Sequence, residues 1–162
     1  MEIHTLLKMP PFQGITEEEL LSLILAPEHA RRQCKPADFI AMQGEAYRSL
    51  FILCCGSVRT QMVSAEGKQL TIETLKAPQL LAPAFVFASE NRFPVNIEAK
   101  EKCEILIINK NVFLEFLHRH PTVMRNFLQL VSDRTLFLSK KLNAFALQSL
   151  KSRILKIGRA HV

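Results

Sequence analysis

The chain has 162 residues, of which 48% are hydrophobic, and a formal net charge of +6. This length and composition predict one domain of ordinary size, or one domain with an appendage, and exclude a chain too polar to form a core. Because no apolar run is long enough for a bilayer and the N-terminal residues lack a signal-peptide pattern, we expect a cytoplasmic protein without a membrane partner.

The first predicted element is a helix that begins after Thr16. Three glutamates, Glu17–Glu19, follow this threonine, which is the pattern of a capping box with an acid-rich first turn. We expect the helix to run to about Leu25, because Pro27 stops it.

A β-rich region is predicted from about Arg31 to Ile108. Short apolar or alternating runs are separated there by turns that contain Gly44, Gly56 and Gly67. Glycine supplies positive φ at tight turns, and the spacing is that of an all-β sandwich or barrel. The segment "SAEGKQ", residues 64–69, has the composition of a hairpin tip.

The period becomes helical from Asn109. Residues 109–120, "NKNVFLEFLHRH", predict a short helix that is capped by Asn109 or Asn111 and ends before Pro121.

A long helix is predicted to begin near Pro121. Its apolar residues repeat with the a/d spacing of a two-stranded coiled coil over about three heptads. Met124, Val131, Leu138 and Phe145 recur every seventh residue, and Leu128, Thr135 and Leu142 fill the second position. A helix packed only on its own domain would show the same stripe, but the length favours a dimer whose interface is Met124, Leu128, Val131, Thr135, Leu138 and Leu142.

Catalytic and metal-binding patterns are weak throughout. The four cysteines have no C-x-x-C spacing, and neighbours such as Cys54 and Cys55 would point to opposite faces of a strand. We therefore predict buried, inert thiols, no metal, no cofactor and no enzymatic activity. From Arg134 onward the chain carries basic residues and no acidic one, which fits either a solvated helix face or a segment that approaches nucleic acid.

Several short segments, taken in order, resemble one known family. They are "PPFQGIT" at residues 10–16, Gly44-Glu45 after "FIAMQ", "SLFILCCGSVRT" at residues 49–60, the turn at Glu66-Gly67, and "IEAKEKCEILIINKNVFLEFL" at residues 97–117. Together the chain resembles, over nearly its whole length, the sensor half of the Crp/Fnr family of bacterial transcription regulators. The resemblance implies a mainly β domain with flanking helices, a double-stranded β-helix (jelly roll) of the cyclic-nucleotide-binding kind. A long C-terminal dimerisation helix and a DNA-reading winged helix-turn-helix would follow it.

The resemblance also implies where an effector would bind. Cyclic-AMP-binding members carry a cassette with Gly-Glu and, about ten residues later, Arg-Ser-Ala; the glutamate takes the ribose hydroxyl and the arginine pairs with the cyclic phosphate. Counting back from Ala99-Lys100, those places hold Ala82-Pro83 and Phe93-Pro94-Val95. The effector pocket is therefore expected at Ala82, Pro83, Ala84, Asn91, Arg92, Phe93 and Pro94.

The departures from the cassette argue against cyclic AMP. Pro83 offers no side-chain acceptor, and Phe93 cannot balance an anion. Losing a bidentate phosphate contact costs several kcal/mol, so the effector is expected to be a different, unknown small molecule. Arg92 would point to the other side of a strand unless a bulge re-aims it, and we expect it at the surface.

The expected organisation has four parts. Residues 1–119 form the effector-sensing domain, residues 120–146 the dimerisation helix, and residues 147–156 the start of a truncated winged helix-turn-helix domain. Residues 157–162, "IGRAHV", match the translation of a common sequencing adapter and are expected to be a non-native tail. The expected partners are a second copy of the chain and, through a C-terminal domain that this chain lacks, DNA.

Two other functions remain open on sequence. A cyclic-nucleotide-domain-like module could regulate another signalling protein, such as a kinase or a channel. A jelly-roll enzyme of the cupin kind is disfavoured, because that chemistry needs clustered histidines on strands and no β segment here has them.

Overall fold

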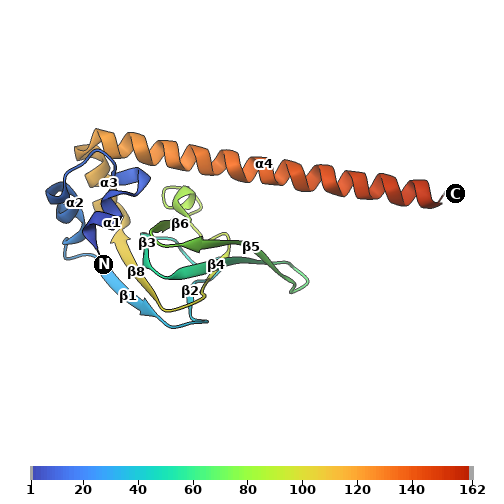
Figure 1. The fold of residues 1–162 in the computed structure, drawn as a ribbon, viewed down its shortest axis with the longest axis horizontal. Helices are drawn as coiled ribbons and strands as arrows, with labels where there is room; N and C mark the ends of the chain where they lie inside the picture. The colour runs from blue at the N-terminus through green and yellow to red at the C-terminus, as the bar shows by residue number, and fades with distance from the viewer. Residues whose placement is uncertain (1, 161–162) are drawn as a thin grey trace.

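The computed structural model describes residues 2–160, and it consists of a β-roll, a group of helices at one end of the roll, and one long helix (Figure 1). The roll is built from two four-stranded antiparallel sheets, ordered β1-β8-β3-β6 and β2-β7-β4-β5. The strands are β1 (Ala30–Cys34), β2 (Phe39–Ala41), β3 (Ser49–Cys55), β4 (Ser57–Val63), β5 (Gln69–Lys76), β6 (Gln79–Leu81), β7 (Asn96–Ala99) and β8 (Cys103–Asn109). The predicted jelly-roll fold with flanking helices is confirmed.

The helices are α1 (Ile3–Leu7), η1 (Pro10–Phe12), α2 (Glu17–Ile24), η2 (Pro83–Phe85), α3 (Lys110–Arg119) and α4 (Pro121–Ala160). Helices α1, α2 and α3 lie together at one end of the roll, whereas α4 runs past it (Figure 1). Within residues 2–160, no helix is both long enough and apolar enough to cross a bilayer.

The core lies between the two sheets. The central pair β3 and β8 places Leu53 opposite Ile105, and both side chains are fully buried. Along β3, Leu50 and Ile52 are buried on one face of the strand and Leu53 on the other, so both faces of this central strand are covered there. The continuous apolar run of this segment is the pattern of a strand buried on both faces.

The start of α2 is the capping box that the sequence predicts. The backbone N–H of Glu19 donates to the Thr16 hydroxyl over 3.1 Å, and the Thr16 N–H donates to the Glu19 carboxylate over 2.8 Å. The sequence did not predict α1 or η1, which are too short to show a period. Both elements carry core residues, since Leu6 and Phe12 are each 1% exposed.

The turn between β3 and β4 requires a glycine at Gly56. Its φ is +89°, and a Cβ placed there would lie 2.4 Å from the carbonyl oxygen of Lys102 and 2.8 Å from the Cys103 sulfur. Gly67 also has a positive φ, +82°, but lies in open space at the predicted hairpin tip between β4 and β5.

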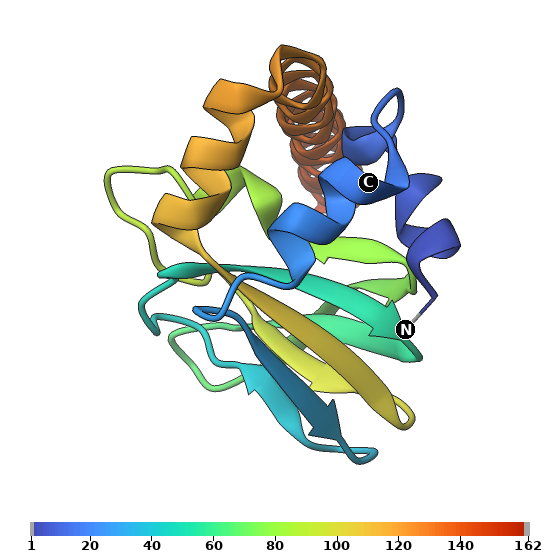
Figure 2. The ribbon, with the colours of Figure 1, turned by 90° about the vertical axis from the view of Figure 1, so that its left-hand side faces the viewer.

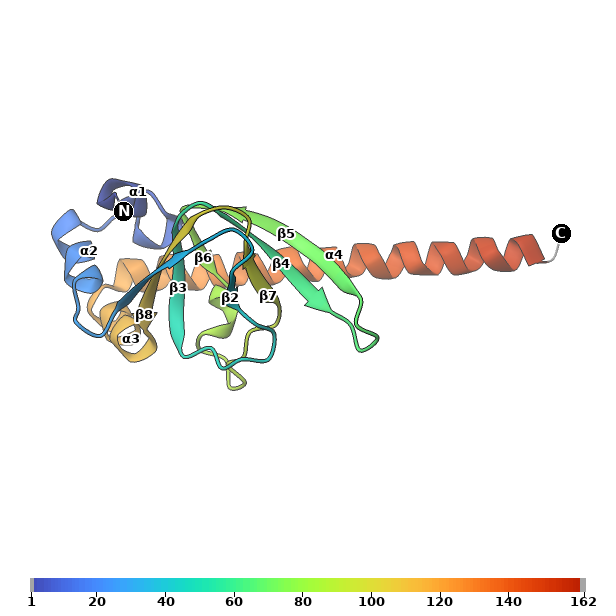
Figure 3. The ribbon, with the colours of Figure 1, turned by 90° about the horizontal axis from the view of Figure 1, so that it is seen from below.

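Helices α3 and α4 follow the predicted order. Asn109 caps α3 by accepting from the backbone N–H groups of Asn111 and Val112, and α4 begins at Pro121. Helix α4 then runs without a break to Ala160, well past the roll (Figure 3). The predicted change of domain between residues 146 and 147 therefore does not coincide with a helix end, and this division stays a prediction.

The cysteines depart in one respect from the expected buried thiols. None of the four forms a disulfide; Cys34 and Cys103 are buried, Cys54 is half-buried, and Cys55 is exposed. Cys55 lies at the end of β3 just before the Gly56 turn, where the strand leaves the core. Burial raises the pKa of the Cys54 thiol to about 11, so this thiol stays protonated at neutral pH.

The two glycine turns provide a stability test. We expect Gly56→Ala to lower the free energy of unfolding by about 2–4 kcal/mol, because the new methyl group meets a backbone oxygen in a left-handed turn. Gly67→Ala is the matched control, since it has the same φ penalty in open space and should cost about 1 kcal/mol. Urea unfolding measures both, and equal losses would show that the close approach at Gly56 is not a constraint.

Candidate functional site

The expected effector cassette is the segment that connects β6 to β7. Figure 2 shows its yellow-green loop beside α3. Ala82, which has a left-handed backbone (φ +49°, ψ +46°), precedes the short helix η2 at Pro83. Since η2 has only three residues and its first residue has no N–H, it presents no helix N-terminus for a phosphate.

Phe93 is part of the core rather than of an open pocket. Its side chain is 3% exposed, and its ring centroid lies 4.3 Å from that of Tyr47 and 5.3 Å from that of Phe51. Its backbone pairs with the segment after β2, because the Gly44 N–H donates to the Phe93 carbonyl and the Phe93 N–H donates to the Glu45 carbonyl, both over 2.9 Å. The place where the resemblance puts the arginine of cyclic-AMP-binding members is therefore filled by packed aromatic rings.

Tyr47 joins the two halves of the cassette. Its hydroxyl donates to the carbonyl of Leu81, just before the first half, over 2.5 Å. Its backbone N–H donates to the carbonyl of Asn91 in the second half, and the Asn91 amide donates back to the Tyr47 carbonyl over 3.1 Å. Complete burial raises the pKa of Tyr47 far above its usual range, so the hydroxyl remains a donor at any ordinary pH.

Arg92 points away from this cluster. It is exposed, and its guanidinium donates to the carbonyl of Gly44 over 2.8 Å. The prediction that it lies at the surface is confirmed, and its strand-like bridge to Ala46 supplies the physical reason. The remaining cassette residues Ala82, Ala84 and Pro94 are half-buried, and Pro83 is buried.

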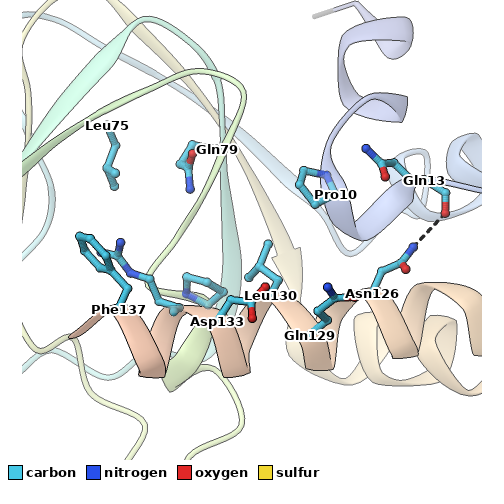
Figure 4. Close-up of a pocket in the computed structure, with 11 residues that line it drawn as sticks. Pro10, Gln13, Leu75, Gln79, Asn126, Gln129, Leu130, Asp133 and Phe137 are labelled. Carbon is cyan, nitrogen blue, oxygen red and sulfur yellow. Dashed lines mark hydrogen bonds between the residues drawn. The ribbon is translucent and has the colours of Figure 1, made fainter. Parts of the chain in front are cut away.

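A groove of about 400 Å³ lies between the roll and α4 (Figure 4). Of the expected cassette residues, it includes Pro83. The roll contributes Leu75 and Gln79, and α4 contributes residues such as Leu130 and Phe137. The structure thus separates the cassette into a buried half around Phe93 and a half at Pro83 that borders a groove.

An ion pair at the edge of this groove links the roll to α4. Arg134 of α4 forms a bidentate ion pair with the Glu73 carboxylate of β5, and the two side chains are 29% and 15% exposed. Thr60 and Gln61 of β4 pair with Glu73 and Thr71, which leaves Ile72 as the extra residue of a bulge before Glu73. Partial burial lowers the pKa of Arg134, but a guanidinium remains charged.

Three phenylalanines hold α4 at its base. The ring of Phe127 in α4 lies 5.2 Å from Phe113 of α3 and 5.9 Å from Phe87 of the cassette loop, both edge to face. Phe87 and Phe113 stack at 6.2 Å. We call these residues the aromatic anchor; it joins the cassette loop, α3 and α4.

Sequence reasoning missed Tyr47, Glu73 and Arg134 as a set. Arg134 was noted only as the first of a run of basic residues, and the bulge that aims Glu73 leaves no trace in the alternation of β5. The single tyrosine of the chain was a usable signal, since a tyrosine buried between apolar strands needs a partner for its hydroxyl.

The profile of the cyclic nucleotide-binding domain matches residues 31–120. The chain belongs to this family. The match covers the roll from β1 to the end of α3, so the fold and the recognised family agree.

Relatives of the chain within the cyclic nucleotide-binding domain family include Crp/Fnr-type transcription regulators. A transcriptional regulator from Thermotoga maritima is 33% identical; the match covers 79% of this chain and 95% of that one, with a TM-score of 0.70. The catabolite activator protein of Thermus thermophilus shares the fold at 22% identity and a TM-score of 0.74, over 85% of this chain and 63% of that one. The anaerobic regulatory protein of Bacillus subtilis is 19% identical over 76% of this chain, which spans about half of its length (52%).

The filled cassette predicts that cyclic AMP does not bind. Pro83 and Phe93 leave no carboxylate for a ribose and no cation for a phosphate at these two places. Calorimetric titration with cyclic AMP should give no heat of binding, and the melting temperature should not change with the nucleotide. A dissociation constant in the micromolar range would contradict this reading, and Arg92→Ala would then test whether the surface arginine supplies the contact.

Proposed function

We propose that this chain is the effector-sensing and dimerisation part of a Crp/Fnr-type DNA-binding transcription regulator that does not respond to cyclic AMP. The observation that carries the proposal is the division of α4 into two apolar stripes. One stripe packs on the roll, and the other lies beside it with Leu128 and Leu142 exposed in the described chain.

The first stripe faces the chain's own domain. Val123 and Phe127 are buried, and Leu130 and Arg134 continue the same side of the helix at spacings of three and four residues. Phe127 packs on α3, and Arg134 pairs with β5. Of the predicted seam, Met124 and Val131 also lie partly buried against the chain's own core.

The second stripe is the predicted seam. Leu128 is 59% exposed and Leu142 is 71% exposed, while Met124, Val131 and Leu138 are half-buried. Thr135, the polar member, donates its hydroxyl to the Val131 carbonyl over 2.9 Å, so it can enter an apolar interface without losing a hydrogen bond. Met124 and Val131 also pack partly against the chain's own core, but no such contact accounts for the exposed Leu128 and Leu142. The heptad spacing of the whole stripe fits a second copy of the same helix.

The proposed division of labour follows from these contacts. Residues 1–119 sense an effector, and residues 120–146 dimerise. The segment from residue 147 onward leads toward a domain that reads DNA. A small molecule at the cassette would act on α4 through the aromatic anchor and the Glu73–Arg134 pair, which both join the roll to the helix. The proposed partners are a second copy, a small-molecule effector and DNA, and we propose a cytoplasmic, non-enzymatic protein.

The seam predicts a dimer that a single charge can break. Leu142→Asp would place an unpaired carboxylate between two helices, which costs several kcal/mol, while leaving the chain's own core untouched. We expect sedimentation equilibrium to show a dimer for the unaltered chain and a monomer for this variant.

Leu136→Asp is the matched control for the seam. Leu136 is 54% exposed on the same helix but lies roughly 120° around it from Leu142, at 100° per residue. This variant should stay dimeric. A monomeric unaltered chain, or a Leu142→Asp dimer, would place the interface elsewhere.

The DNA-reading role predicts a difference between this chain and a longer protein that contains it. The cations from Lys140 to Arg159 provide non-specific, steeply salt-dependent affinity, but sequence is read by side chains held against base edges. In gel shifts at near-physiological salt, we expect the 162-residue chain not to distinguish a palindromic site of the family's type from a scrambled duplex. A longer protein from the same reading frame should distinguish them, and failure to do so would favour a module that regulates a kinase or a channel.

A further inference from the structure

The groove between the roll and α4 is a second concave site, separate from the buried half of the cassette. It is lined by Pro10 of η1, by Leu75 and Gln79 of the roll, and by the side of α4 that carries Gln129 and Asp133 (Figure 4). Its volume, about 400 Å³, falls within the range of small-molecule pockets. A molecule bound there would touch three parts of the fold at once.

The groove stays open when the seam is covered. With roughly 100° per residue, Asp133 lies about 180° around the helix from Met124 and Leu142. Residues that pack on the roll, such as Arg134, lie between these two sides. A partner helix on the seam would therefore occupy the opposite side of α4 and leave the groove accessible.

The groove offers one unpaired acceptor and one donor with spare capacity. Arg134 uses two of its five N–H groups for Glu73 and makes no other hydrogen bond among residues 2–160. Its guanidinium also lies over the ring of Phe137, 5.2 Å from the ring centroid. Asp133 lines the groove, is exposed, and makes no ion pair or hydrogen bond within the described chain. The groove is therefore lined both by an unpaired carboxylate and by a guanidinium with N–H groups to spare.

The other side chains in the groove lining are apolar or carry amide groups. Leu75, Leu130 and Phe137 provide hydrophobic surface, and the amides of Gln79 and Gln129 can each donate and accept. Figure 4 shows Leu75 and Gln79 on the roll side directed toward the α4 residues. The Asn126 amide is already engaged, because it donates to the carbonyl of Gln13 over 2.9 Å.

We infer that this groove binds a free amino acid with an apolar side chain. The ammonium would pair with Asp133, the carboxylate would accept from Arg134 and a glutamine amide, and the side chain would cover Leu75, Leu130 and Phe137. A ligand with only a negative charge is disfavoured, because Asp133 and Glu73 would repel it. A ligand with only a positive charge would leave the spare donors of Arg134 unused.

The ligand would change how firmly α4 is held. It contacts Gln79 on the roll and Asp133 on the helix, so its binding energy depends on the spacing between them. Because Arg134 also holds Glu73, an amino acid in the groove would strengthen or loosen the same ion pair that links the two parts. Amino acid binding in this groove would be independent of DNA binding and of the buried half of the cassette.

Isothermal titration of the 162-residue chain tests the inference with L-leucine and L-phenylalanine. Phenethylamine, which lacks the carboxylate, and N-acetyl-L-phenylalanine, which lacks the ammonium, are the comparison ligands. We expect saturable binding of at least one amino acid and about tenfold or weaker binding of both comparison ligands. No saturable binding of either amino acid, or equal binding of a comparison ligand, overturns the inference.

Variants locate the site. Asp133→Asn and Gln79→Ala should each weaken amino acid binding, the first by about tenfold. Glu115→Gln removes the same charge from an exposed carboxylate on α3 and should bind like the unaltered chain. Circular dichroism checks that each variant is folded. Unchanged affinity in both folded groove variants would place any binding elsewhere and so overturn the assignment.

Discussion

The aromatic anchor of Phe87, Phe113 and Phe127 is the contact on which the rest of the arrangement depends. It is the point where the cassette loop, the end of the roll and the long helix meet, with ring distances of 5.2–6.2 Å. Buried aromatic rings contribute a large apolar area and prefer a few relative orientations, so the anchor fixes the position of α4 as well as its attachment. The groove, the Glu73–Arg134 pair and the exposure of the seam all follow from the angle at which α4 leaves this point.

The second half of the expected cassette is packed into the core at Phe93. Tyr47 and Phe93 fill the interior with packed rings, and the Tyr47 hydroxyl satisfies a backbone carbonyl that would otherwise be buried without a partner. A site for an anion needs the opposite, a cation with room around it. The same backbone can therefore keep the family's shape while its chemistry changes, which is why membership of the cyclic nucleotide-binding domain family does not by itself name the effector.

Local sequence patterns predicted much of the fold, but they did not predict contacts between residues far apart in the chain. The capping box at Thr16, the Gly56 turn and the start of α4 at Pro121 depend on neighbouring residues, and the sequence shows them directly. The contact of Tyr47 with Phe93 joins residues far apart in the chain, and the bulge that aims Glu73 is a shift of one residue in strand pairing. Neither the ring contact nor the bulge leaves a periodic or compositional signal in the sequence. The resemblance therefore gave an expected place for the cassette, but not the aromatic packing that occupies it.

The length of α4 converts a small rotation at its base into a large displacement at its far end. At about 1.5 Å per residue, the helix extends roughly 30 Å from Arg134 to Leu155, and it is attached to the roll at Arg134. A tilt of α4 by about 10° about Arg134 would move Leu155 sideways by roughly 5 Å, which is close to the rise of one helical turn. A change in the roll too small to alter its strands would thus become a displacement large enough to reposition whatever the far end of the helix carries.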